Sequence, residues 1–313
     1  MRSKNAFYAP ALLCVIYILT SFSQNLSGFL SELSDSNTLL SVIIIQCVVF
    51  LLPVAFYCRV RGINFVTALS FRPVTLSSLG FAFTSFLLFF AGSALLKFVS
   101  QAFWDRPVGG GVSLMEAYPG QGALILIAYV ALPALLEELV FRSIIIHEYS
   151  PYGGFFAVTV SALSFAMLHF SFKSFGEYFV AGLMFAVMTY VCESVIPAIL
   201  LHVANNALNV FMPDVFAEYV SRTGNSTLLF YILTAAFLLI LCMWLGQLEY
   251  IYHKKADEAA RDQRAHILFL ESEKKLKKSA KQPGFARRAA EVFLSPGLIA
   301  AAVIFILKAI SAI

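Results

Sequence analysis

The sequence predicts an all-α fold, a polytopic bundle of about eight or nine transmembrane helices with a basic helical segment on the cytoplasmic side before the last span. Of the 313 residues, 60% are hydrophobic, 13% are charged and 31 are phenylalanine. A typical soluble protein carries about 25% charged residues, and it cannot bury this much apolar surface. A lipid bilayer can, so the composition excludes an ordinary soluble enzyme.

Long apolar runs indicate where the helices lie. A spanning helix needs about 20 mostly apolar residues, and runs of this length are too long and continuous for the strands of a membrane barrel. The predicted helices lie near residues 7–24, 38–58, 76–100, 121–147, 153–170, 176–192, 196–212, 228–247 and 292–312.

The basic residues between these runs predict the orientation, because cytoplasmic loops are enriched in Lys and Arg. Arg2 and Lys4 precede the first run, residues 59–75 contain three arginines, and residues 248–291 contain eleven of the 22 basic residues. Nine alternating spans place all three basic regions on one side. We therefore expect an integral, multi-pass membrane protein with a cytoplasmic N-terminus.

Residues 248–291 form the one long polar stretch of the sequence. Most of it is expected to be helical and to continue the preceding span, with a break at residues 282–284. A solvated linker is one interpretation, and anionic lipid, worth about 1 kcal/mol per basic residue near the surface, is the other. No nucleic-acid partner is expected. The basic side chains concerned are Lys274, Lys275, Lys277, Lys278, Lys281, Arg287 and Arg288.

Most of these apolar runs are almost free of ionisable residues, and the exceptions cluster in three of them. A charged residue at the bilayer centre costs about 2.5–3.5 kcal/mol, so such residues rarely face lipid. They are expected to face one another or a wet cavity, which predicts a shared functional site. The candidates are Glu137, Glu138 and Arg142 in the fourth run, His169 at the end of the fifth, and His202 and Asn206 in the seventh.

Helix geometry predicts which of these groups pair. Glu138 and Arg142 are four residues apart, so they share a face and are expected to form an ion pair. Glu137 lies about 100° away around the helix and is expected to be the freer carboxylate. His202 and Asn206 are also four apart and present two polar groups on one face.

Two chemistries suit this set of residues. In the first, a carboxylate in a dry site acts as general base, a histidine holds the same water, and a second histidine with an amide stabilises the oxyanion. In the second, His169, His202 and one glutamate supply the three protein ligands of a catalytic Zn²⁺, and the other glutamate is the base. The metal candidates are then Glu137, His169 and His202, and both chemistries remain open.

Each feature alone also has a structural explanation. The Glu138–Arg142 pair is of a kind that more often holds a fold together, a histidine such as His169 at a span end is usually interfacial, and Asn206 can join neighbouring helices. Three polar clusters in adjacent apolar helices are hard to explain without a shared site.

The three motifs resemble the signature of the CAAX-protease and bacteriocin-processing family of intramembrane proteases, also called Abi or type II CAAX endopeptidases. That signature is EExxxR, FxxxH and HxxxN/D on successive helices, and here the phenylalanine is Phe165. The resemblance implies that Glu137 is the general base with His169 orienting the water. It implies that His202 and Asn206 stabilise the oxyanion, and that Glu138 and Arg142 support the site. The family is commonly classed as metallopeptidase, although a metal-independent mechanism is also argued for it.

The resemblance implies an intramembrane endopeptidase that acts on a membrane protein or peptide, with or without a lipid group, in the plasma membrane of a bacterium. Residues 1–120 are expected to form N-terminal transmembrane helices, 121–212 the CAAX-protease-like core, and 213–313 the C-terminal helices. A non-proteolytic scaffold or regulator, as in bacteriocin immunity, is the alternative. A proton-coupled transporter is disfavoured because we find no internal repeat.

Overall fold

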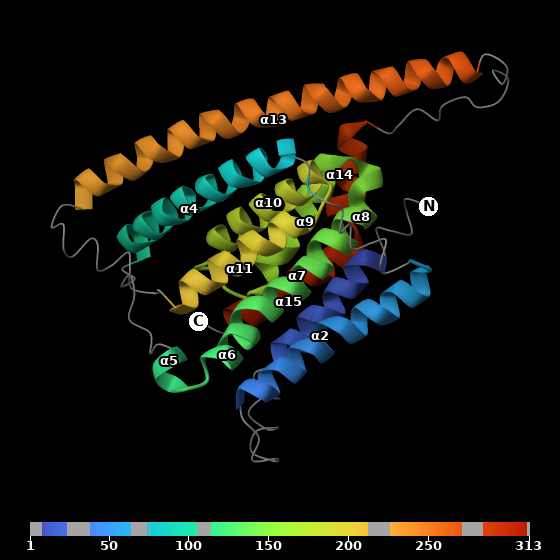
Figure 1. Ribbon diagram of the computed structural model, residues 1–313. Coiled ribbons are helices and arrows are strands. Elements are labelled where there is room, and N and C mark those ends of the chain that lie inside the picture. Colours follow the sequence, from blue (N-terminus) through green and yellow to red (C-terminus); the bar gives the residue numbers. More distant parts are fainter. Residues whose placement is uncertain are drawn as a thin grey trace.

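The computed structural model describes residues 8–23, 38–63, 74, 76–104, 114–211, 226–270 and 284–311. Every regular element in these residues is a helix, which confirms the all-α fold class (Figure 1). The helices are Tyr8–Ser23, α2 (Thr38–Arg61), α4 (Leu76–Trp104), α5 (Leu114–Ala117), α6 (Gly122–Ile125), η1 (Leu126–Ala131), α7 (Leu132–Glu138), η2 (Leu139–Ile145), α8 (Ile146–Tyr149), η3 (Ser150–Tyr152), α9 (Gly154–Leu168), α10 (Phe175–Cys192), α11 (Ile196–Phe211), α13 (Ser226–Leu270), α14 (Phe285–Phe293) and α15 (Pro296–Ile310).

All nine predicted apolar runs contain helix, but they differ in length. Five helical segments in the described residues are long and apolar enough to cross a membrane, or six if the bent pair α14–α15 counts as one span. The apolar helices Tyr8–Ser23, α9 and α11 are shorter than a usual span. The protein is therefore an integral membrane protein, while eight or nine spans and a cytoplasmic N-terminus stay predictions.

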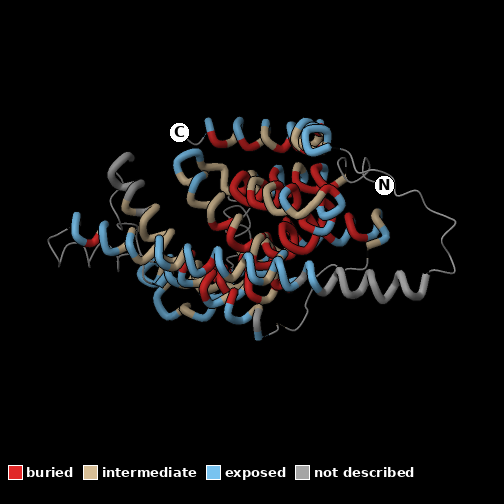
Figure 2. Tube along the Cα trace, turned by 90° about the horizontal axis from the view of Figure 1, so that it is seen from above, coloured by how far each residue is buried: buried red, intermediate tan, exposed pale blue. Residues whose placement is uncertain are grey.

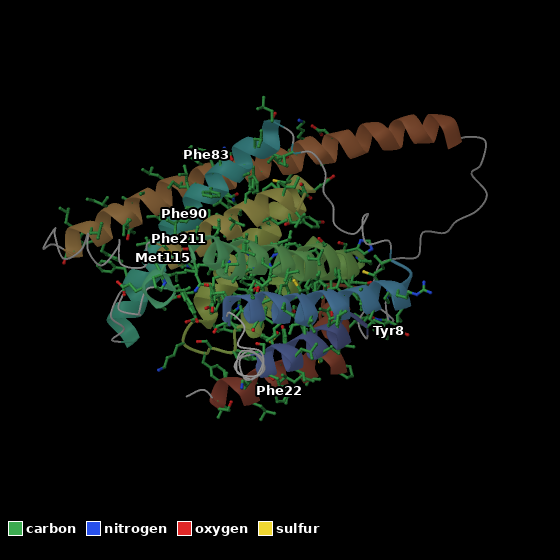
Figure 3. All side chains as sticks on the ribbon, turned by 60° about the horizontal axis from the view of Figure 1, so that its bottom comes forward. Tyr8, Phe22, Phe83, Phe90, Met115 and Phe211 are labelled. Atoms are coloured by element: carbon green, nitrogen blue, oxygen red, sulfur yellow. The ribbon has the colours of Figure 1, made fainter. Side chains whose placement is uncertain are left out.

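The helices pack in layers around α7, α9, α10 and α11 (Figure 1). On one side α4 covers α10 and is itself covered by α13, and on the other side α2 packs on α7. Buried residues concentrate at the centre, whereas few of the described side chains of α13 are buried (Figure 2). The apolar side chains that point outward, such as Phe22 and Phe83, are suited to contact with lipid (Figure 3).

Helix α13 confirms that the eighth apolar run continues into the polar stretch. It is one helix of 45 residues, which at 1.5 Å per residue is about 68 Å long and exceeds the thickness of a bilayer. Its apolar part covers Thr227–Lys254. The basic residues from Lys274 to Lys281 and most of the predicted break at 282–284 lie outside the described residues.

The fourth segment, Gly122–Tyr152, is a continuous helical span with two π-helical turns. These turns, η1 and η2, flank the short helix α7, which carries Pro133 in its first turn. Proline has no backbone N–H to donate and so disturbs the regular hydrogen-bond ladder. π-helical turns are rare and occur frequently at functional sites. Here they lie on either side of the adjacent carboxylates Glu137 and Glu138.

Candidate active site

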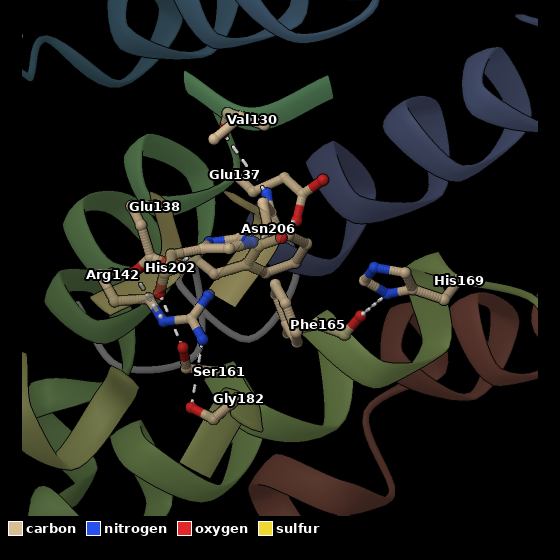
Figure 4. A network of polar contacts seen from close by, with 11 residues as sticks. Val130, Glu137, Glu138, Arg142, Ser161, Phe165, His169, Gly182, His202 and Asn206 are labelled. Atoms are coloured by element: carbon tan, nitrogen blue, oxygen red, sulfur yellow. Dashed lines mark hydrogen bonds and ion pairs between the residues drawn. The ribbon is translucent and has the colours of Figure 1, made fainter. Parts of the chain in front are cut away.

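Glu138 is the centre of a buried charge network. One carboxylate oxygen, Oε2, lies 3.1 Å from Nε of Arg142, and the side chains of both residues are 0% exposed. The other oxygen, Oε1, accepts a hydrogen bond of 2.9 Å from Nδ1 of His202. The predicted pairing of Glu138 with Arg142 is confirmed, and the network joins the fourth segment to α11 (Figure 4).

The guanidinium group of Arg142 is enclosed on several sides. Its Nη2 donates to the carbonyl oxygen of Gly182 at 3.1 Å, and its Cζ lies 4.6 Å from the ring centre of Phe165 and 5.2 Å from that of Phe185. Gly182 allows α10 to lie close to α9, because a Cβ atom there would lie 3.1 Å from Phe165 and from the backbone of Ala162. Cation–π contacts and a carbonyl therefore supplement the single carboxylate partner.

Glu137 lies beside this network but outside its hydrogen bonds. Its Oε2 is 3.8 Å from Nε2 of His202, and that buried oxygen forms no hydrogen bond. The side chain is 12% exposed and lines a cavity of about 460 Å³. Glu137 is therefore the freer of the two carboxylates, as predicted.

The cavity lies between the fourth segment and helices from both ends of the chain. Pro133 and Glu137 form one wall, and the residues that end α9 form another. The other walls come from Tyr8–Ser23, α2 and α15, which are remote from the three motifs in sequence. Its lining residues are Thr20, Ser21, Ser23, Ile45, Gln46, Val49, Phe50, Pro133, Glu137, Leu168, His169, Phe170, Lys308 and Ser311.

His169 lines the same cavity, and its hydrogen-bond and ring contacts are made away from Glu137. Its Nδ1 lies 3.0 Å from the carbonyl oxygen of Phe165, to which it donates in the tautomer that this contact requires. Its ring stacks on Tyr178 at 3.6 Å. The ring of Phe165 packs between the two histidines, 5.0 Å from His169 and 5.6 Å from His202. The imidazole that lies within 4 Å of Glu137 is thus that of His202, whereas the ring of His169 stands on the other side of Phe165 from His202 in Figure 4.

A left-handed residue ends α9 immediately after His169. Phe170 has a φ of 47°, a conformation that is uncommon for a residue with a side chain. Its ring packs edge-on against Tyr17 at 6.0 Å. Such strained residues cluster at active sites because the surrounding packing must hold them, and here the strain accompanies the turn that places His169 on the cavity.

Asn206 joins α11 to the first π-helical turn. Its Nδ2 donates to the carbonyl oxygen of Val130 over 3.4 Å, a long hydrogen bond. His202 and Asn206 therefore share a face, as their spacing predicted, and that face meets the fourth segment. They contact it at different points, because Asn206 meets η1 and His202 meets Glu138.

The described side chains do not fit a three-ligand zinc site. Among them, no three His, Cys, Asp or Glu residues are placed to hold one metal ion, whereas a catalytic zinc uses three protein ligands. Glu137 and His202 face each other, but His169 makes its contacts elsewhere. No step proposed below runs through a metal.

Two polar residues of the cavity wall, Lys308 and Gln46, were not among the site residues predicted from the sequence. Lys308 is the only charged residue of α15, so the cost of charge in an apolar run was a signal that it has a polar environment. Gln46 interrupts the apolar α2, and its Nε2 donates to the carbonyl oxygen of Ala128 at 3.0 Å. Lone polar residues in the flanking apolar runs therefore also indicate a polar environment, which here is the cavity.

The family model described as type II CAAX prenyl endopeptidase Rce1-like matches residues 119–208. This segment contains all three motifs, and the match confirms the resemblance to the CAAX-protease family. It covers less than a third of the chain and leaves the N-terminal helices, α13, α14 and α15 outside. No curated protein and no solved structure gives a significant match.

Proposed function

We propose that the protein is an intramembrane endopeptidase that hydrolyses a peptide bond of a membrane-associated protein or peptide. The match of its core to the type II CAAX prenyl endopeptidase family model supports this proposal. The observation that carries the proposal is the position of Glu137. A buried carboxylate with an oxygen free of hydrogen bonds lines a cavity, and an imidazole nitrogen lies 3.8 Å from that oxygen.

In this proposal Glu137 and His202 hold the attacking water together. Because Nδ1 of His202 donates to Glu138, Nε2 of the neutral ring is an acceptor. One water then donates one proton to Nε2 and the other to the carboxylate of Glu137. Its oxygen lone pairs point into the cavity, towards a substrate carbonyl.

Glu137 takes the water proton as the new carbon–oxygen bond forms. The proton then passes to the substrate nitrogen as the carbon–nitrogen bond breaks, which releases one carboxylic acid and one amine. General acid–base catalysis of this kind contributes about 10²–10⁴-fold in rate. Glu138 and Arg142 do not touch the substrate in this scheme, and they position His202.

The amide of Asn206 is the proposed donor to the oxyanion. It lies one turn after His202, and its present hydrogen bond to Val130 is long enough to be exchanged for a stronger acceptor. His169 takes a positioning role across the cavity, because its Nδ1 donates to Phe165 and leaves Nε2 to accept a hydrogen bond from a substrate N–H. The resemblance alone assigned the water to His169, whereas the contact with Glu137 favours His202 for that role.

A non-proteolytic scaffold explains the network less completely. Glu138 already forms an ion pair with Arg142 and a hydrogen bond with His202, so a structural role requires no second carboxylate. Burial of Glu137 beside them costs free energy, because its buried oxygen forms no hydrogen bond. An additional buried carboxylate on a cavity wall is the feature that catalysis uses and that a scaffold does not need.

The test compares new protein termini in membranes of cells that produce the wild type, Glu137→Gln or Glu148→Gln. Glu148 is a matched control, because it is a second buried carboxylate on the same segment, paired with Arg61 and absent from the cavity wall. We expect the same new termini from the wild type and Glu148→Gln and none from Glu137→Gln, at equal amounts of folded protein. A full set of termini from Glu137→Gln would refute the proposal.

A further inference from the structure

Several arginines gather at one end of the helix bundle. Arg61, at the end of α2, pairs with Glu148, and its guanidinium lies 5.2 Å from the ring centre of Tyr8 at the start of the first helix. Arg288 of α14 donates to the carbonyl oxygen of Tyr152, the last residue of the fourth segment, at 2.7 Å. We call this end of the bundle, which is marked by Arg61 and Arg288, the basic end.

The helices of the core alternate between the basic end and the opposite end. Helix α9 starts at the basic end, because Gly154 follows closely after Tyr152. Helix α10 ends there, since a Cβ atom on Gly154 would lie 2.6 Å from the side chain of Tyr190. Helix α4 begins beside the end of α10, where the thiol of Cys192 donates to the carbonyl oxygen of Ser78 at 3.8 Å.

Helix α13 leads the polar stretch of the sequence to the basic end. It runs antiparallel to α4, because Thr84 donates to Gln247 at 2.6 Å, whereas the ring centres of Phe98 and Phe230 lie 5.5 Å apart further along the pair. Gln247 therefore lies towards the basic end. Residues 248–291, which contain eleven of the 22 basic residues, start from this end and return to it at α14.

The cavity that contains Glu137 lies towards the opposite end. Three helices that start at the basic end contribute their last residues or C-caps to its wall, which are Ser23 of the first helix, His169 of α9 and Ser311 of α15. Figure 1 shows α8 and α14 at one end of the molecule and α5 and α6 at the other. We call the end with Ser23, His169 and Ser311 the cavity end.

The sequence near the cavity end contains few basic residues. The segments 24–37, 105–113 and 212–225 join helices whose ends lie there, and they contain two basic residues. The other basic residues towards this end are Lys97, Lys173 and Lys308. Cytoplasmic loops are enriched in Lys and Arg, whereas Asp and Glu contribute little to orientation. The difference therefore favours the cytoplasm for the basic end and the other side of the membrane for the cavity end.

We propose that the catalytic cavity opens on the non-cytoplasmic side of the membrane, and that the substrates are membrane proteins or peptides whose cleaved segment lies on that side. This inference rests on the proposed function and adds to it the class of segment that is cleaved. Such a segment has crossed the membrane before it reaches Glu137, so cleavage follows export. The water for hydrolysis enters from the same side, past the hydroxyl groups of Thr20, Ser21, Ser23 and Ser311 on the cavity wall.

The first arm of the test determines the side of each end without relying on catalysis. The parent protein carries Cys242→Ser, because Cys242 is an exposed cysteine. Ser311→Cys and Lys173→Cys report on the cavity end, and Arg287→Cys is the matched variant on α14 at the basic end, since all three positions are exposed. A membrane-impermeant maleimide is added to intact cells and, separately, to inverted membrane vesicles from the same cells.

We expect the maleimide to label Ser311→Cys and Lys173→Cys in intact cells, with loss of this labelling in inverted vesicles. Arg287→Cys should show the reverse pattern, and the parent protein should stay unlabelled in both. Labelling of Arg287→Cys in intact cells, or failure of Ser311→Cys to react there, overturns the proposal.

The second arm locates the new termini that distinguish the wild type from Glu137→Gln. We expect these termini in segments on the non-cytoplasmic side of their membrane proteins. Termini in cytoplasmic segments overturn the proposal, whatever the labelling shows. A complete lack of termini that depend on Glu137 refutes the proposed function instead, and the labelling still decides on which side the cavity opens.

Discussion

Two Arg–Glu pairs have their buried glutamates ten residues apart on the fourth segment, and the two pairs have different surroundings. Glu138 pairs with Arg142 of the same helix, whereas Glu148 pairs with Arg61 at the end of α2 through contacts of 3.0 and 3.3 Å. Arg61 is 19% exposed and its guanidinium lies 5.2 Å from the ring centre of Tyr8. The second pair joins two helix ends, and neither of its members lines the cavity.

The difference between the pairs is the additional carboxylate. Beside Glu138 and Arg142 lies Glu137, which faces a cavity and has an oxygen without a hydrogen bond. Ion pairs that only hold helices together are matched in charge, because an uncompensated buried charge is costly. We therefore propose that the pair at Glu138 supports a site, whereas the pair at Glu148 supports the fold.

The largest expected effect is on turnover in Glu137→Gln. Loss of the general base should lower the cleavage rate about 10²–10⁴-fold, while the temperature of thermal unfolding in detergent stays at the wild-type value. Single-turnover rates with the substrate found by the terminus comparison measure the first quantity. If the unfolding temperature fell together with the cleavage rate, Glu137 would belong to the structural network.

The second largest expected effect is a loss of stability in Arg142→Ala. This substitution leaves Glu138 charged and buried without its partner, which should cost about 3–5 kcal/mol. Denaturant titration followed by tryptophan fluorescence measures it. The double variant Glu138→Leu/Arg142→Met should regain much of that free energy, because apolar residues of similar size often replace a buried pair at little cost. A double variant as unstable as Arg142→Ala would contradict this account.

A smaller effect is expected at the second pair. Glu148→Gln should lower the free energy of unfolding by about 1–3 kcal/mol, because the partly exposed Arg61 loses its charged partner. The cleavage rate per folded molecule should stay at the wild-type value, since Glu148 does not reach the cavity. A lower rate in fully folded Glu148→Gln would remove the distinction between the two pairs.

An effect of similar size on stability is expected in Gly182→Ala. The new methyl group would lie 3.1 Å from Phe165 and from the backbone of α9, and such overpacking costs about 1–3 kcal/mol. It should also weaken the contact of Arg142 with the carbonyl oxygen of Gly182. As a control, Gly176→Ala has open space around the added Cβ and should leave the stability unchanged. Equal stability of both variants would show that α9 and α10 can move apart freely.

The sequence by itself determined the features that depend on local spacing and on the cost of charge in lipid. The apolar runs predicted helices at nine places, and the structure has helix at each of them. The spacing of four residues predicted the Glu138–Arg142 pair. The same spacing left Glu137 as the freer carboxylate, because 3.6 residues per turn fix the directions of neighbouring side chains on one helix. The three motifs predicted the resemblance to the CAAX-protease family, which the family-model match over residues 119–208 confirms.

The tertiary structure decided which side chains of different helices meet. It put His202 rather than His169 next to Glu137, and it brought Thr20, Gln46 and Lys308 from remote runs to the same cavity. It also placed π-helical turns on both sides of α7. These features depend on the relative rotation, depth and crossing of helices, which many residues fix together through packing, and no spacing within one helix encodes them.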